Sequence, residues 1–96
     1  MSENTLDDIK LETRKLILEI LNIEDVEPEE ISTEISLLSG ENIITIDSID
    51  VLEVVVAIQK KFEVSIRDAN HARLIVNTVD SIAEFVQTQH QEPAHS

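Results

Sequence analysis

Apolar residues in the middle of the chain recur at helical spacing and predict an α-helix from Ser48 to Phe62 or Glu63. The stripe advances by steps of four, three and four, as one face of a helix requires, and consists of Val51, Val55, Ile58 and Phe62. Asp47 is a favourable N-cap, and Asp50 can complete a capping box with it. A strand over residues 52–58 is the alternative, but Glu53 interrupts the apolar run and the stripe exceeds strand length. We therefore predict a helix.

A first helix is predicted to end near Leu21 and Asn22, because asparagine tolerates the left-handed conformation common after helices. Residues 2–5 offer several N-caps for its start. Its apolar face is expected to consist of Leu6, Ile9, Leu16 and Ile20.

Two shorter helices are predicted after residue 67. Asp68 can cap a third helix that exposes His71 and Arg73 and turns Leu74 or Val76 inward. Thr78 can cap a fourth helix, whose apolar set is Val79, Ile82, Ala83 and Val86. The polar end of the chain lacks such a pattern, so we expect a domain over residues 1–89 and a disordered tail over 90–96.

Residues 23–46 show no sustained hydrophobic periodicity, so we predict a loop there. Pro28 is expected to open a short turn and Gly40 to permit a bend. We expect Ile31, Ile35 and Leu37 to anchor the loop to the core. A loop of this length is often functional. It is also long enough that the first two helices need not be antiparallel neighbours. The pattern as a whole predicts one all-α domain.

Charge and composition narrow the possible functions. The 96 residues have a formal net charge of -13, and Lys and Arg are absent between Lys15 and Lys60. Nucleic acids and anionic membranes require a cationic surface, so we expect partners with basic docking patches instead. Cysteine is absent, so any thiol must come from an added group. The N-terminus has no signal-peptide pattern and no apolar run could span a bilayer, which favours a cytoplasmic protein.

Ser48 is the candidate for chemistry. In the first helical turn its hydroxyl is expected near solvent, where free backbone N–H groups and the helix dipole favour an attached phosphate. The structural alternative is a serine that only helps to start the helix. Ser81 has the same neighbours in Asp80-Ser81-Ile82, but it lies three residues after Thr78 and is explained by a capping turn.

The order of elements and the segment Asp47-Ser48-Ile49-Asp50 resemble the acyl carrier protein family. The hallmark of that family is Asp-Ser-Leu, followed by an acidic residue, at the start of its second helix. Residues 51–62, including the terminal Phe62, also look like that helix. The resemblance covers about residues 5–89 and implies a four-helix acyl-carrier-like bundle with a long loop between helices one and two and a short third helix.

The resemblance implies that the protein is a carrier and not an enzyme. A phosphopantetheinyl transferase would attach 4′-phosphopantetheine to Ser48, and the thiol of this arm would present acyl thioesters to acyl-transferring and condensing enzymes. Helix two is the usual docking face in the family. The docking residues implied here are Asp47, Ile49, Asp50, Glu53 and Val56, with carboxylates steering and apolar side chains making contact. We expect a monomer that meets its enzymes transiently.

The apolar arc of this helix is wider than a single core-facing stripe needs. Some of its residues are therefore expected to be exposed or to line space for an acyl chain, and the alternative is that all of them belong to the core.

The sequence departs from the family in two notable segments. Ile44-Thr45-Ile46 replaces the usual approach to the serine, and Gln59-Lys60-Lys61 replaces an acidic end of helix two. These departures make a polyketide, specialised-lipid or peptidyl carrier as suitable as a fatty-acid carrier.

Two other classes of function are alternatives to the carrier. A hydrolytic Ser48 would need a nucleophile elbow, which the sequence lacks, and His90 and His95 form no convincing metal site. An acidic helical adaptor or nucleic-acid mimic without a prosthetic group remains the alternative from a different class, because of the charge gap between Lys15 and Lys60.

Overall fold

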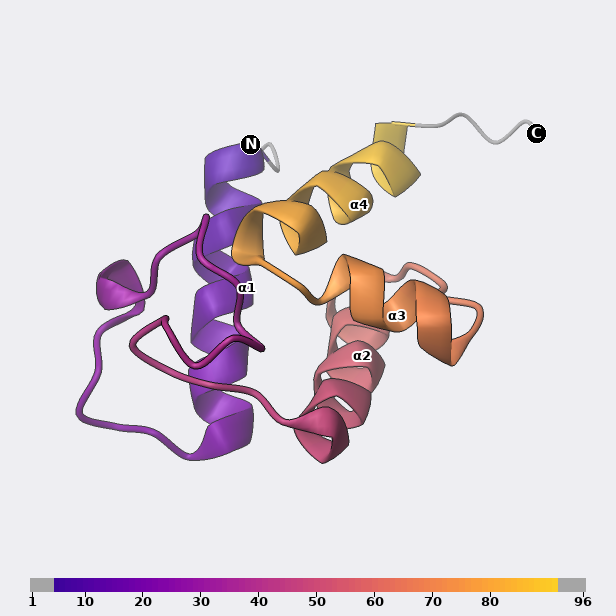
Figure 1. Ribbon diagram of the computed structural model, residues 1–96. Coiled ribbons are helices and arrows are strands. Elements are labelled where there is room, and N and C mark those ends of the chain that lie inside the picture. The colour runs from indigo at the N-terminus through magenta and orange to yellow at the C-terminus, as the bar shows by residue number, and fades with distance from the viewer. Residues whose placement is uncertain (1–4, 92–96) are drawn as a thin grey trace.

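The computed structural model describes residues 5–91, and this part of the chain is helical and contains no strand (Figure 1). The elements are α1 (Leu6–Leu21), the short 3-10 helix η1 (Pro28–Glu30), α2 (Ser48–Phe62), α3 (Ala69–Ile75) and α4 (Val79–Gln91). The predicted all-α class is therefore confirmed at the level of a small bundle of four α-helices. The strand alternative for residues 52–58 is wrong.

Side-chain caps fix where the helices begin. Thr5 accepts a hydrogen bond from the backbone N–H of Asp8 and starts α1. Asp68 and Thr78 do the same for α3 and α4. Asp47 caps α2 in the same way. Each cap satisfies a backbone donor that the helix itself leaves free, and the predicted starts of α2, α3 and α4 are confirmed. α1 ends at Leu21, and its C-cap Asn22 adopts the left-handed conformation with φ 57°.

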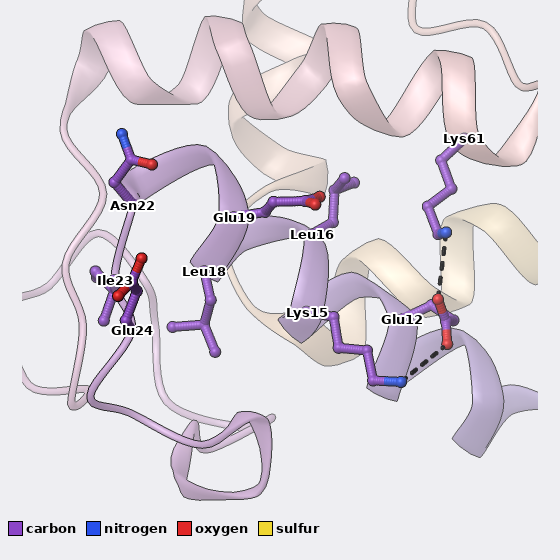
Figure 2. A pocket seen from close by; sticks show the side chains of 9 residues that line it. All are labelled: Glu12, Lys15, Leu16, Leu18, Glu19, Asn22, Ile23, Glu24 and Lys61. Carbon is purple, nitrogen blue, oxygen red and sulfur yellow. Dashed lines mark ion pairs between the residues drawn. The ribbon is translucent and has the colours of Figure 1, made fainter.

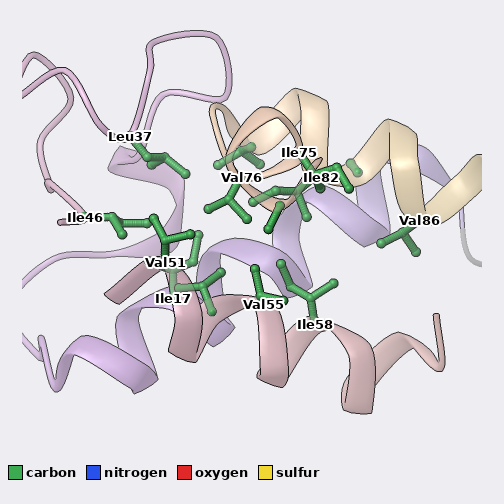
Figure 3. Packing of buried hydrophobic residues seen from close by; sticks show 14 of the residues in the cluster. Ile17, Leu37, Ile46, Val51, Val55, Ile58, Ile75, Val76, Ile82 and Val86 are labelled. Carbon is green, nitrogen blue, oxygen red and sulfur yellow. The ribbon is translucent and has the colours of Figure 1, made fainter. Parts of the chain in front are cut away.

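The core lies between α1 and the helices α2 and α4, and α3 contacts both α2 and α4 (Figures 1 and 3). α1 packs mainly against α4 and also contacts α2. The predicted stripes of α2 and α4 are all buried: Val51, Val55, Ile58 and Phe62, then Val79, Ile82, Ala83 and Val86. Burial of these β-branched and aliphatic side chains is the main favourable term for a domain of this size.

The predicted face of α1 is only partly correct. Ile9 is buried, but Leu6, Leu16 and Ile20 lie at the edge of the core. The fully buried residues of α1 include Thr13 and Ile17, because the stripe 9–13–17 faces the neighbouring helices. Thr13 interrupts the apolar pattern with a hydroxyl and was therefore missed.

The loop between α1 and α2 runs back along α1 and is held by specific contacts (Figure 1). Ile31 and Leu37 are buried as predicted, whereas Ile35 is 40% exposed. Ile35 fails as an anchor because the Ser32 hydroxyl accepts from its backbone N–H and forms a local turn at the surface. The polar Asn42 is buried instead, and its amide donates to the carbonyl oxygens of Ser32 and Ile35.

Backbone hydrogen bonds fasten the loop to the link between α3 and α4. The N–H of Leu37 donates to the Asn77 carbonyl at 2.7 Å, and the N–H of Ile46 donates to the Leu37 carbonyl at 2.8 Å. Gly40 makes the predicted bend with φ 85°, a conformation that residues with a side chain rarely adopt. These contacts fix the chain just before Ser48.

The ends of α3 and α4 can be compared with the prediction. Either Leu74 or Val76 was expected to point inward, and Val76 is the buried one, while Leu74 is 73% exposed. α4 continues to Gln91, two residues past the expected domain end at residue 89. The ring of His90 contacts the Phe62 carbonyl oxygen at 2.6 Å, which adds a polar contact between the ends of α4 and α2. The remainder of the expected tail, residues 92–96, lies outside the described residues.

Candidate functional site

Ser48 is the first residue of α2, and its side chain is exposed. The N-terminus of the helix is capped by its neighbours and does not need this hydroxyl. The Asp47 carboxylate accepts from the Asp50 N–H at 2.9 Å, and the Asp50 carboxylate accepts from the Asp47 N–H at 3.4 Å. Because this capping box uses the side chains of Asp47 and Asp50, the hydroxyl of Ser48 stays accessible to a reaction partner.

The electrostatic setting of Ser48 combines opposing contributions. The positive end of the α2 dipole favours an anion near the hydroxyl. The carboxylates of Asp47 and Asp50 oppose it, although both are engaged in the capping box. An attached phosphate would therefore be stable here if a cation balanced the two carboxylates.

Such a cation comes from α3. Nη2 of Arg73 donates to the Ser48 Oγ at 3.2 Å, across 25 residues of sequence. Arg73 was expected to be exposed, and it is, but its contact with Ser48 was not predicted. No local pattern could have revealed it, because the pairing depends on how α3 packs against α2.

Ser48 and Arg73 line a small surface hollow with residues of the loop and the first turn of α2. Its other lining residues are Leu38, Ile46, Asp47 and Val51. Its lining thus combines apolar and polar side chains, as suits a ligand with both charged and aliphatic parts.

The outward face of α2 is apolar beyond what the core requires. Ile49, Leu52 and Val56 are 70%, 59% and 50% exposed, and Glu53 lies exposed among them. The alternative that the whole apolar arc belongs to the core is therefore wrong. Leu52 was missed as a surface residue, although its spacing of three from Ile49 and four from Val56 places it on the same face.

The predicted docking residues of α2 are not equally accessible. Asp47, Ile49, Glu53 and Val56 are exposed, whereas Asp50 is half-buried and bound into the capping box. Exposed apolar side chains grouped beside carboxylates are typical of a protein-interaction surface.

A larger hollow lies away from Ser48, between the second half of α1 and the last turn of α2 (Figure 2). Three of its charged side chains pair with one another: the Glu12 carboxylate contacts Nζ of Lys61 at 3.2 Å and Nζ of Lys15 at 3.6 Å. Its lining includes neither a serine nor a histidine. We therefore do not place the functional site there.

Ser81 occupies a different environment from Ser48. Its hydroxyl is half-buried, donates toward the Ile75 and Thr78 carbonyl oxygens and accepts from the Thr78 N–H at 3.0 Å. These bonds confirm the capping-turn interpretation of Ser81.

The described residues form neither a metal-binding cluster nor a membrane-spanning helix. Within residues 5–91, no three His, Cys, Asp or Glu side chains gather closely enough to hold a metal ion. No helix in the same range has the length and apolar character needed to cross a membrane.

Comparisons with known proteins do not assign the chain to a family. No protein-family model matches the sequence, and no curated protein matches it significantly.

Proposed function

We propose that the protein is a carrier that bears 4′-phosphopantetheine on Ser48 and presents thioester-bound acyl intermediates to biosynthetic enzymes. The observation that carries this proposal is the geometry of Ser48, an exposed hydroxyl at the capped N-terminus of α2. The resemblance of Asp47-Ser48-Ile49-Asp50 and of the order of helices to acyl carrier proteins supports it, as does the α1–α2 loop that leads to Ser48.

The proposed modification needs only a hydroxyl from this chain. The Ser48 oxygen attacks the phosphorus of coenzyme A that carries the pantetheine, a new P–O bond forms, and the pyrophosphate bond breaks. Adenosine 3′,5′-bisphosphate leaves, and the serine proton passes to a base of the transferase. The arm supplies the thiol that this cysteine-free chain lacks.

The outward face of α2 fits the transient docking that such a carrier needs. Exposed Ile49, Leu52 and Val56 provide apolar contact, and Asp47 and Glu53 steer basic partners toward it. We propose the transferase and the acyl-transferring and condensing enzymes as these partners. The pathway could handle fatty acids, polyketides, specialised lipids or peptidyl groups.

Co-expression with a broad-specificity phosphopantetheinyl transferase tests the proposal. We expect the wild-type protein to gain the mass of one phosphopantetheine and one titratable thiol. Ser48→Ala should gain neither while retaining its helical circular dichroism. Ser65→Ala is the matched control, because Ser65 is an exposed serine outside the helices, and it should be modified like the wild type.

The same experiment separates the carrier from an acidic adaptor. An adaptor would keep its unmodified mass in every variant and would contain no thiol. That result would overturn the proposed function.

A further inference from the structure

Arg73 stands out because it is the cation in contact with Ser48 in an acidic region of the chain. Lys and Arg are absent from residues 16–59, so α2 has no cation within three turns of Ser48. α3 supplies one, with the Arg73 Nη2 at 3.2 Å from the Ser48 Oγ. Nothing in the capping of α2 requires this contact, because Asp47 and Asp50 already satisfy each other.

We propose that Arg73 is a positioning residue that binds the phosphate joining the arm to Ser48. This inference rests on the proposed function. In the modified protein the phosphorus lies one bond beyond the Ser48 Oγ, so its free oxygens fall within reach of a guanidinium already in contact with that atom. The planar fork of arginine suits phosphate oxygens, and bonds from the guanidinium to an anionic phosphate are stronger than its present bond to a neutral hydroxyl.

The contact with Arg73 would reduce electrostatic repulsion between the phosphate and its acidic neighbours. A phosphodiester carries one negative charge and would lie beside Asp47 and Asp50, two further negative groups. The helix dipole offsets part of the repulsion, and Arg73 offsets more of it from the α3 side. The arm would then leave Ser48 with its root held at the hollow lined by Leu38, Ile46, Val51 and Arg73.

Phosphorus NMR of the modified protein tests this role directly. Arg73→Gln should shift the phosphodiester resonance relative to wild type, and Arg73→Lys should give a smaller shift because it keeps the charge. Arg67→Gln is the matched control: it removes the same charge from an exposed arginine just before α3 and should leave the resonance in place. Raising the salt concentration should reduce the difference between wild type and Arg73→Gln, since salt screens exposed charges.

A second readout follows Arg73 itself. Its Nε–Hε signal should move between the unmodified and modified wild-type protein, whereas the Arg67 signal should not. Equal phosphorus shifts in Arg73→Gln and Arg67→Gln, with an unmoved Arg73 signal, would overturn the positioning role. Mass measured beforehand keeps the two proposals apart: a missing arm defeats both, whereas an arm present on Ser48 but insensitive to Arg73 defeats only this one.

Discussion

The chain contains the tripeptide Asp-Ser-Ile twice, each time at the start of a helix, and the two copies have different surroundings. In residues 47–49 the aspartate is the N-cap, the serine is exposed and the isoleucine is 70% exposed. In residues 80–82 the serine is half-buried and bound to backbone groups, and the isoleucine is fully buried. Asp80 does not cap its helix but pairs with Lys10 of α1 at 2.9 Å.

The difference arises from register. The first copy begins at the N-cap itself, whereas the second begins two residues after the cap Thr78. Two positions on a helix correspond to a rotation of more than half a turn. The same three side chains therefore face solvent at the start of α2 and the core at the start of α4. Position relative to the cap, and not the tripeptide, decides which serine is available for modification.

The largest expected contrast is in the free energy of unfolding when each of the two isoleucines is truncated to alanine. Ile82→Ala should lower the free energy of unfolding by about 2–5 kcal/mol, because Ile82 is fully buried and truncation leaves a cavity. Ile49→Ala should change it by less than about 0.5 kcal/mol, as is usual for exposed positions. Urea denaturation of both variants measures the contrast. Equal losses would show that Ile49 and Ile82 contribute equally to the core and would contradict the difference in register.

Alanine variants of the two serines should differ by a smaller amount in their free energy of unfolding. Ser81→Ala removes a hydroxyl that accepts from the Thr78 N–H and donates toward backbone oxygens, so we expect a loss of about 1–3 kcal/mol. Ser48→Ala removes an exposed hydroxyl and should cost less than about 0.5 kcal/mol. Thermal unfolding followed by circular dichroism would reveal the reverse order if Ser48 were the structural serine.

Replacing each of the two aspartates by asparagine should have a cost in stability that depends on pH for Asp80 and not for Asp47. The hydrogen bond and ion pair with Asp80 raise the pKa of Lys10 above its ordinary value of 10.5. The pair therefore stabilises the fold below about that pH and ceases to do so as the pH rises through the higher folded-state pKa. Asp80→Asn should cost about 0.2–1 kcal/mol at pH 7, and this cost should shrink above the pKa of folded Lys10.

Asp47→Asn is the matched control, because asparagine caps helices as well as aspartate does. Its effect should be small and should not follow the titration of Lys10. Urea unfolding of both variants between pH 7 and pH 12 gives the comparison. A cost of Asp80→Asn that stays constant over this range would contradict the role given to the Lys10 pair.

The smallest expected contrast concerns docking. Glu53→Lys reverses a charge on the exposed face of α2 beside Ile49, whereas Glu84→Lys makes the same change on α4. Glu53→Lys should slow modification by the transferase a few-fold and weaken its dependence on salt, because electrostatic steering acts on the association rate. Glu84→Lys should have less effect. Initial rates measured over a range of ionic strength would refute this docking face if both variants behaved like wild type.

Most of the helical framework follows from local sequence signals. Asp47, Asp68 and Thr78 are caps that act over three residues, and the stripes of α2 and α4 repeat at helical spacing, so both can be recognised without a structure. The exposure of Ser48 could be predicted for the same reason, since it depends on its position relative to Asp47.

The features that were missed depend on contacts between distant segments. Asn42 is buried because its amide satisfies carbonyl groups of Ser32 and Ile35, and polar residues carry no periodic signal for burial. Ile35 is apolar yet exposed, which apolar character alone does not reveal. The contact of Arg73 with Ser48 depends on the packing of α3 against α2.

Site-resolved mass spectrometry of the wild-type protein after reaction with the transferase and coenzyme A tests the contrast between the two serines most directly. We expect the phosphopantetheine mass on the peptide that contains Ser48 and none on the peptide that contains Ser81. The group on Ser81, or its absence from both peptides, would contradict the proposed carrier function at Ser48.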